Sequence, residues 1–182
     1  MHIILDHIAF REKVNYLTQQ IILKYPRRDD VVFIGIQQGG VALADEIVSQ
    51  LQELDPSQQV QYGQLDITFY RDDMRQEILA PDTMNLPFSI ENKKVVLIDD
   101  VLFTGRTIKA ALDVLLDYGR PAKVQLCVLI DRKEHRQFPI QADYAGVTLS
   151  TDNMDKVKLI KDNNDSKHVV LIKSASHAKE VN

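Results

Sequence analysis

The sequence predicts an α/β protein with a mostly parallel central sheet and helices on both faces. Mostly apolar stretches at residues 31–36, 95–98 and 124–130 have the length of strands buried on both sides. Stretches with a helical period lie between them, so helices and strands alternate along the chain. With 182 residues, 45% of them hydrophobic, the chain is long enough for one well-packed domain over residues 1–182.

Two amphipathic helices are predicted in the first third of the chain. The first spans residues 10–23, with Asp6 placed to start it. A turn at residues 26–30 leads into the strand at 31–36, and the second helix covers residues 41–51. Their apolar faces consist of Phe10, Val14, Leu17 and Ile21 in the first helix and Val41, Ala44, Ile47, Val48 and Leu51 in the second.

The middle of the chain predicts a strand followed by a long loop. Residues 60–69 alternate, with one slip near Gly63 that indicates a β-bulge. Residues 71–87 are polar and aperiodic, which is typical of a flexible loop that closes over an active site.

The stretch 95–107, VVLIDDVLFTGRT, predicts a strand, a turn and the start of a helix. Asp99 and Asp100 are expected to end the strand, Thr104 and Gly105 to form the turn, and a helical period begins at Ile108. Gly119 and Pro121 are typical of a helix end. Shorter strands are expected at 157–160 and 169–172, separated by a charged turn.

Charge and cysteine content exclude several function classes. The net charge is −4 and the pI about 5.7, so no overall field attracts the chain to nucleic acid or anionic lipid. Cys127 is the single cysteine; it excludes a disulfide within the chain and is expected to pack as a small hydrophobic side chain. No apolar run is long enough to cross a membrane and no signal-peptide pattern is present, so we expect a cytoplasmic protein.

The stretch 95–107 has the chemistry of a cradle for a sugar phosphate. Amides at a helix N-terminus and in the preceding loop attract a phosphate, while adjacent carboxylates accept hydrogen bonds from sugar hydroxyls. The plainer alternative is an ordinary strand–turn–helix with solvated acids. Because ligands bind at the carboxyl ends of strands in such sheets, we expect the turns after Ile36, Ile98 and Ile130 to meet at one edge.

The stretch 95–107 resembles the phosphoribosyl diphosphate (PRPP) motif of type I phosphoribosyltransferases. Residues 63–73 (GQLDITFYRDD), 118–122 (YGRPA), 128–132 (VLIDR) and the spacing of charged residues over 135–143 resemble the PyrR-type uracil phosphoribosyltransferases within that family. The resemblance implies the type I fold with a small hood region. It also implies transfer of phosphoribosyl from PRPP to uracil, giving UMP and diphosphate, with Mg²⁺ entering with PRPP.

The resemblance assigns a role to each candidate residue. Asp99 and Asp100 are expected to be the catalytic acids at the ribose. Asp131 and Arg132 are expected on the side of the site that takes the base and the metal-bound diphosphate. The alternative for Asp131 and Arg132 is a surface ion pair with little effect on stability. Tyr70, Arg71 and Asp72 start the closing loop. Two backbone segments are expected to hold phosphates: Gln37, Gln38, Gly39 and Gly40 for the diphosphate, and Val101, Leu102, Phe103, Thr104, Gly105, Arg106 and Thr107 for the 5′-phosphate.

The chain departs from the family pattern at several positions. The family commonly carries Thr-Arg-Gly where this chain has Gln38, Gly39 and Gly40, so a diphosphate-binding guanidinium is missing, which lowers the expected rate and PRPP affinity. Cationic or donor residues that PyrR proteins use for RNA are replaced here by Gln19, Gln141 and Val147. Arg136 matches the family pattern but is expected to be an ordinary solvated side chain. We therefore predict no tight binding of attenuator RNA.

Alternatives to a uracil transferase remain open at this stage. They are a UMP-sensing RNA-binding regulator, a PRPP- or nucleotide-binding relative with little turnover, and a purine-base transferase. The resemblance also implies a homo-oligomer, a dimer or larger.

Overall fold

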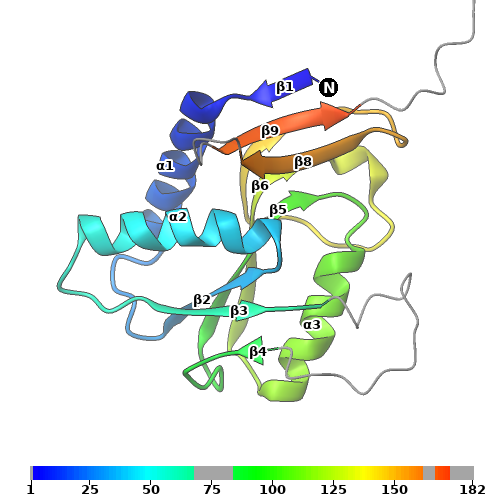
Figure 1. The fold of residues 1–182 in the computed structure, drawn as a ribbon. Coiled ribbons are helices and arrows are strands. Elements are labelled where there is room, and N and C mark those ends of the chain that lie inside the picture. Colours follow the sequence, from blue (N-terminus) through cyan, green and yellow to red (C-terminus); the bar gives the residue numbers. More distant parts are fainter. Residues whose placement is uncertain (1, 68–83, 162–166, 173–182) are drawn as a thin grey trace, which may run out of the picture.

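The computed structural model describes residues 2–67, 84–161 and 167–172, and its main feature is a six-stranded sheet (Figure 1). The strand order is β4-β3-β2-β5-β6-β7, and all neighbours are parallel except β4, which runs antiparallel to β3. The predicted α/β class with a mostly parallel sheet is therefore confirmed. The strands are β2 (Val31–Ile36), β3 (Gln61–Leu65), β4 (Met84–Asn85), β5 (Lys94–Leu102), β6 (Lys123–Asp131) and β7 (Tyr144–Thr148).

A smaller antiparallel sheet forms the expected hood. It contains β1 (His2–Leu5), β9 (Lys167–Ile172) and β8 (Lys156–Lys161), in that order. It pairs the first residues of the chain with a strand near its end, and Figure 1 shows it above the end toward which β5 points.

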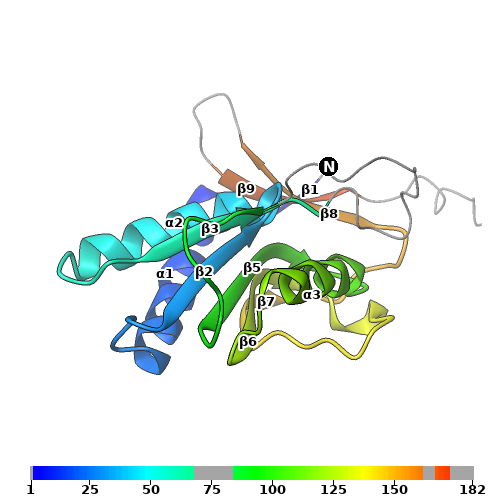
Figure 2. The ribbon, with the colours of Figure 1, turned by 90° about the horizontal axis from the view of Figure 1, so that it is seen from below.

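Helices cover both faces of the main sheet (Figure 2). α1 (His7–Lys24) and α2 (Gly39–Leu54) pack on one face, and α3 (Arg106–Tyr118) packs on the other. Asp6 starts α1 as predicted, because its Oδ1 accepts a hydrogen bond from the amide of Ala9 at 2.8 Å. A short 3₁₀ turn, η1 (Lys133–His135), follows β6.

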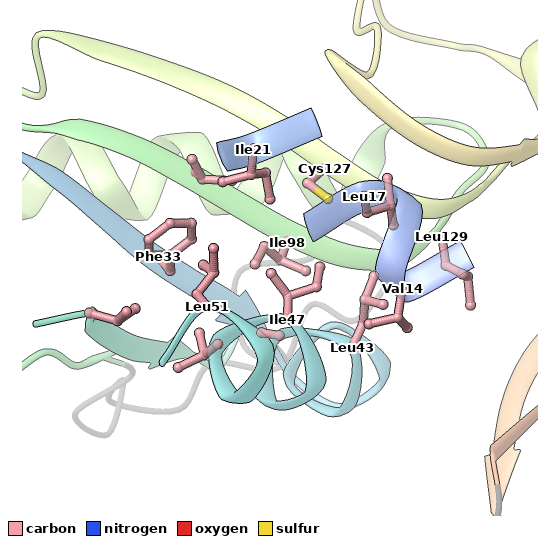
Figure 3. Close-up of a cluster of buried hydrophobic side chains, with 14 of the residues drawn as sticks. Val14, Leu17, Ile21, Phe33, Leu43, Ile47, Leu51, Ile98, Cys127 and Leu129 are labelled. Carbon is pink, nitrogen blue, oxygen red and sulfur yellow. The ribbon is translucent and has the colours of Figure 1, made fainter. Parts of the chain in front are cut away.

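The core on the α1–α2 side joins the two helices to the strands (Figure 3). Val14, Leu17 and Ile21 from α1 meet Leu43, Ile47 and Leu51 from α2 and Phe33, Ile98 and Leu129 from the sheet. Cys127 is fully buried here, as predicted, and burial raises the pKa of its thiol.

Several local predictions are wrong, each because pairing with a distant segment overrides the local pattern. β5 continues through Asp99 and Asp100 to Leu102 because β6 pairs with it along that length, and α3 begins at Arg106 rather than Ile108. No bulge occurs at Gly63, since β3 pairs with β2 in regular register. Three strands were not predicted: β1, β7 and β4, of which β4 lies inside the expected irregular loop. Among the helices described, none is long and apolar enough to cross a bilayer.

Candidate active site

The turns after β2, β5 and β6 meet at one edge of the sheet, as predicted. A Cβ built on Gly39 would lie 2.1 Å from Oδ2 of Asp100, and one on Gly40 would lie 2.4 Å from the carbonyl oxygen of Ile98. The amide of Arg132, just after β6, donates to the carbonyl of Leu102 at 2.9 Å. Residues 98–102 of β5 thus contact both the turn after β2 and the segment after β6.

The two acids sit within β5 and are tied to the backbone. Oδ1 of Asp99 accepts from the amide of Asp100, and Oδ1 of Asp100 accepts from the amide of Val101, both at 2.9 Å. Asp99 is almost fully buried. Burial raises the pKa of Asp100, although hydrogen bonds that include the amides of Val101 and Leu159 oppose this effect. Because Leu159 belongs to β8, the Asp100 carboxylate lies where β5, the start of α2 and the hood meet.

The N-terminus of α3 supplies the backbone geometry expected of a phosphate site. Gly105 precedes the helix with a φ of 90°, a conformation that favours glycine. No acidic residue occupies the first turn, and Gly105 has no side chain with which to cap the helix. Thr104 Oγ1 lies 3.4 Å from the amide of Arg106, which donates to it. The first helical amides are thus placed to attract an anion.

Other members of the predicted phosphate stretch have different surroundings. Val101 and Leu102 are the last residues of β5, and the Leu102 side chain is in the core. Arg106 turns toward the segment after β6: its Nε donates to Oε1 of Gln137 at 2.9 Å, and its guanidinium lies 5.5 Å from the centre of the Phe138 ring. We use the name phosphate loop for residues 103–107. Phe103, Thr104 and Thr107 are each partly buried there.

The turn after β2 leads directly into α2. The amide of Gln37 donates to the carbonyl of Leu65 at 2.9 Å, and the peptide bond between Gln37 and Gln38 is cis. Gln38 precedes the helix without capping it through its side chain, and the first turn of α2 contains no acid. Two helices therefore begin at this edge after residues that make no side-chain capping bond: α2 after Gln38, beside Asp100, and α3 after Gly105.

Asp131 and Arg132 are both buried, so the surface ion pair considered for them is wrong. Asp131 pairs with Arg136, while Arg132 donates to Oγ1 of Thr151 at 2.7 Å. Arg132 also donates to the carbonyls of Asp152 at 2.8 Å and Asp155 at 3.1 Å. Burial lowers the pKa of the Arg132 guanidinium. Arg132 therefore holds the segment 151–155 against the end of β6.

The closing loop, the metal and Arg136 complete the comparison of the predicted site with the structure. Tyr70, Arg71 and Asp72, and the expected loop as far as residue 83, lie outside the described residues. Within the ranges that the structure describes, no three His, Cys, Asp or Glu side chains gather as a metal site. Sequence reasoning missed Arg136, which it treated as a solvated side chain; its single position in a polar stretch carries no periodic signal that predicts burial.

Comparisons with known proteins agree with this geometry. The model of the phosphoribosyl transferase domain family matches residues 2–162. The chain is 44% identical to the bifunctional protein PyrR of Ligilactobacillus salivarius, covering 93% of this chain and 97% of the relative. It is 43% identical to the PyrR of Geobacter sulfurreducens, covering 88% and 90%. The chain therefore belongs to the phosphoribosyltransferase family, and within it to the PyrR proteins.

Solved structures share the fold at low sequence identity. A hypoxanthine phosphoribosyltransferase of Trypanosoma cruzi, a point mutant in a ternary complex with its substrates, matches with a TM-score of 0.72 at 18% identity over 97% of both chains. A hypoxanthine phosphoribosyltransferase of Staphylococcus aureus matches with a TM-score of 0.65 at 20% identity, covering 85% of this chain and 80% of the other. These likenesses concern the fold.

Proposed function

We propose that the protein transfers the phosphoribosyl group of PRPP to uracil, giving UMP and diphosphate. The observation that carries the proposal is the meeting of two helix N-termini with a pair of strand carboxylates at one sheet edge. PRPP has one phosphate at one end of its ribose and a diphosphate at the other, so two anion sites flanking two acids match its charge pattern. Membership of the PyrR proteins, on 44% identity over nearly the whole chain, supports uracil as the base.

Each segment has a defined task in this proposal. The phosphate loop and the first turn of α3 bind the 5′-phosphate through backbone amides and the hydroxyls of Thr104 and Thr107. The turn at residues 37–40 and the first turn of α2 bind the diphosphate. The ribose lies between these two phosphate sites, and Asp99 and Asp100 accept hydrogen bonds from its hydroxyls.

The reaction exchanges one bond at the anomeric carbon for another. The bond from C1′ to the diphosphate oxygen breaks, the bond from C1′ to N1 of uracil forms, and the N1 proton leaves to solvent. Positive charge develops on the ribose as diphosphate departs, and the carboxylates of Asp99 and Asp100 stabilise it. The protein contributes mainly by holding the base and the sugar in line.

Magnesium enters this proposal as part of the substrate. Mg²⁺ keeps several waters and commonly binds through substrate phosphates and one or two carboxylates, so it needs no dedicated protein cage. In the described structure Asp131, the acid expected on this side, is engaged by Arg136.

The test is incubation of the protein with PRPP, Mg²⁺ and a panel of bases: uracil, hypoxanthine, guanine and orotate. We expect UMP from uracil, and little product from the other three bases. Asp100→Asn serves as the inactive control. Uracil turnover no higher than that of Asp100→Asn rejects the proposed transferase, and preferential use of hypoxanthine or guanine identifies a purine transferase instead.

A nucleotide-binding protein with little turnover is the second candidate. It is favoured by the contact between Gly39 and Asp100, because the Asp100 carboxylate occupies the place of a side chain at position 39 and no guanidinium projects from there. Calorimetric binding of PRPP or UMP without product formation supports this candidate. Turnover well above that of the Asp100→Asn control rejects it.

Tight binding of attenuator RNA is not expected. Arg136, a cation retained from the family pattern, is paired with Asp131 and is 15% exposed, while Gln19 on the outer side of α1 is neutral. These two positions therefore offer RNA phosphates little positive charge. A gel shift at low salt with upstream pyrimidine-gene RNA and UMP tests this; UMP-stimulated binding contradicts it.

We also propose that the protein assembles as a homo-oligomer. Ile8, Tyr16 and Leu23 are 59%, 50% and 76% exposed on α1, and Leu54 on α2 is 58% exposed. Exposed apolar side chains of this size on two neighbouring helices supply surface that an interface would bury. Sedimentation equilibrium measures the assembly state, and a monomer at micromolar concentration contradicts the proposal.

A further inference from the structure

One segment engages three successive carbonyls at the start of the phosphate loop. We call residues 132–138 the brace segment. The amide of Arg132 donates to the carbonyl of Leu102 and the amide of Gln137 to the carbonyl of Thr104, both at 2.9 Å. Between them, the Arg136 guanidinium donates to the carbonyl of Phe103. The carbonyls of Leu102, Phe103 and Thr104 are thus turned toward the brace segment, which fixes the orientation of the peptide groups at the start of the loop.

Arg136 is the side chain in this set that joins two parts of the site. Its Nη1 donates to the carbonyl of Phe103, and its Nη2 pairs with Oδ1 of Asp131 at the end of β6. The Arg136 side chain is 15% exposed and that of Asp131 is 2% exposed, so the pair is shielded from water. A planar guanidinium holds two acceptors in a fixed relation, which a flexible ammonium does not do.

The Phe103 ring is held by the same brace segment. The Arg132 guanidinium lies 3.9 Å from the centre of the ring, and the His135 ring meets it edge-on with centroids 5.2 Å apart. His135 Nε2 is also 2.6 Å from the carbonyl oxygen of Thr151. Phe103 is therefore fixed at its carbonyl by Arg136 and at its ring by Arg132 and His135.

We propose that Arg136 is a positioning residue for phosphoribosyl transfer, which sets the orientation of the phosphate loop by tying Phe103 to Asp131. The inference rests on the proposed function for its kinetic consequence. Arg136 acts through the loop backbone and does not touch the substrate. Loss of its guanidinium frees the Phe103 carbonyl, so the loop amides no longer hold one orientation toward the 5′-phosphate.

The test compares Arg136→Gln and Arg136→Lys with Arg27→Gln, a control on an arginine that is 87% exposed and lies outside the site. Amide hydrogen exchange over residues 103–107 is measured in the protein without ligand, together with steady-state constants for PRPP and uracil. For Arg136→Gln we expect faster exchange and a KM for PRPP raised about tenfold or more, the size of one lost charged hydrogen bond. We expect kcat and the KM for uracil to change much less. Arg136→Lys, which reaches one acceptor at a time, should recover part of the loss.

Hydrogen exchange tests the role of Arg136 independently of whether the protein is a transferase. If the wild type makes no UMP, the proposed function fails, while exchange over residues 103–107 still decides whether Arg136 orders the loop. If Arg136→Gln does not fold because Asp131 is left unpaired, the double variant Asp131→Asn/Arg136→Gln removes both charges and is measured in the same way. Exchange and PRPP affinity equal to those of the wild type overturn the proposal.

Discussion

Adjacent glycines at the start of α2 offer a pair of substitutions with opposite expected effects. A Cβ on Gly39 would lie 2.1 Å from Oδ2 and 2.2 Å from Cγ of Asp100, so its conflict is with one carboxylate that can rotate away. A Cβ on Gly40 would lie 2.4 Å from the carbonyl oxygen of Ile98 and 2.9 Å from Cα of Asp99. That conflict is with the backbone of β5. Alanine at 39 therefore moves a catalytic carboxylate, whereas alanine at 40 moves the whole helix.

For Gly39→Ala we expect a large loss of activity with little loss of stability. The displaced carboxylate gives up its hydrogen bond from the amide of Val101, worth about 1–2 kcal/mol, and the gain in helix propensity of up to about 1 kcal/mol offsets part of this. A misplaced catalytic group typically lowers the rate by about 10²-fold. For Gly40→Ala, overpacking against the β5 backbone should cost about 1–3 kcal/mol of unfolding free energy.

Urea unfolding and steady-state kinetics on both variants distinguish the two effects. We expect Gly39→Ala to unfold within about 1 kcal/mol of the wild type and to lose about 10²-fold in kcat/KM. The reasoning is refuted if Gly39→Ala keeps its activity, because the Asp100 carboxylate would then not need the space above Gly39. It is also refuted if Gly40→Ala is as stable as the wild type.

Three further predictions concern the core and the buried acid. Burial raises the pKa of Asp100, so the ionised carboxylate destabilises the folded state. The contribution of Asp100 to folding stability is fully present below the pKa of the unfolded chain and is lost as the pH rises through the raised pKa of the folded state. Asp100→Asn should thus raise the urea midpoint at pH 7, with a smaller gain at pH 4; a lower midpoint at pH 7 contradicts this. Ile47 is fully buried, so Ile47→Ala should cost about 2–5 kcal/mol in urea unfolding, whereas Leu116→Ala, at a 63% exposed position, should cost under about 0.5 kcal/mol. The buried Cys127 thiol should react with a thiol reagent only at the rate of unfolding and immediately in denaturant; fast labelling of the native protein refutes its burial.

Local patterns were sufficient for the central part of the fold. The strand at 31–36, the two helices on the α1–α2 face and the small strands near 157–160 and 169–172 all appear where apolar periodicity placed them. Periodicity reflects which side of an element is buried, and that information is contained in each short stretch. The ends of elements were less predictable. β5 passes through Asp99 and Asp100 because β6 continues beside it, a condition set by residues about thirty positions away.

The sequence by itself determined the class of protein and the ingredients of its site: paired acids, a Thr-Gly turn and a helix start within thirteen residues. Those features are local, since one short segment supplies all of them. Only the tertiary structure placed Asp100 against Gly39 and the hood, and only it turned Arg136 inward to join Asp131 and Phe103. These contacts depend on where separate strands end relative to one another. Burial and pairing of charged side chains arise from that long-range arrangement, and no short pattern encodes it.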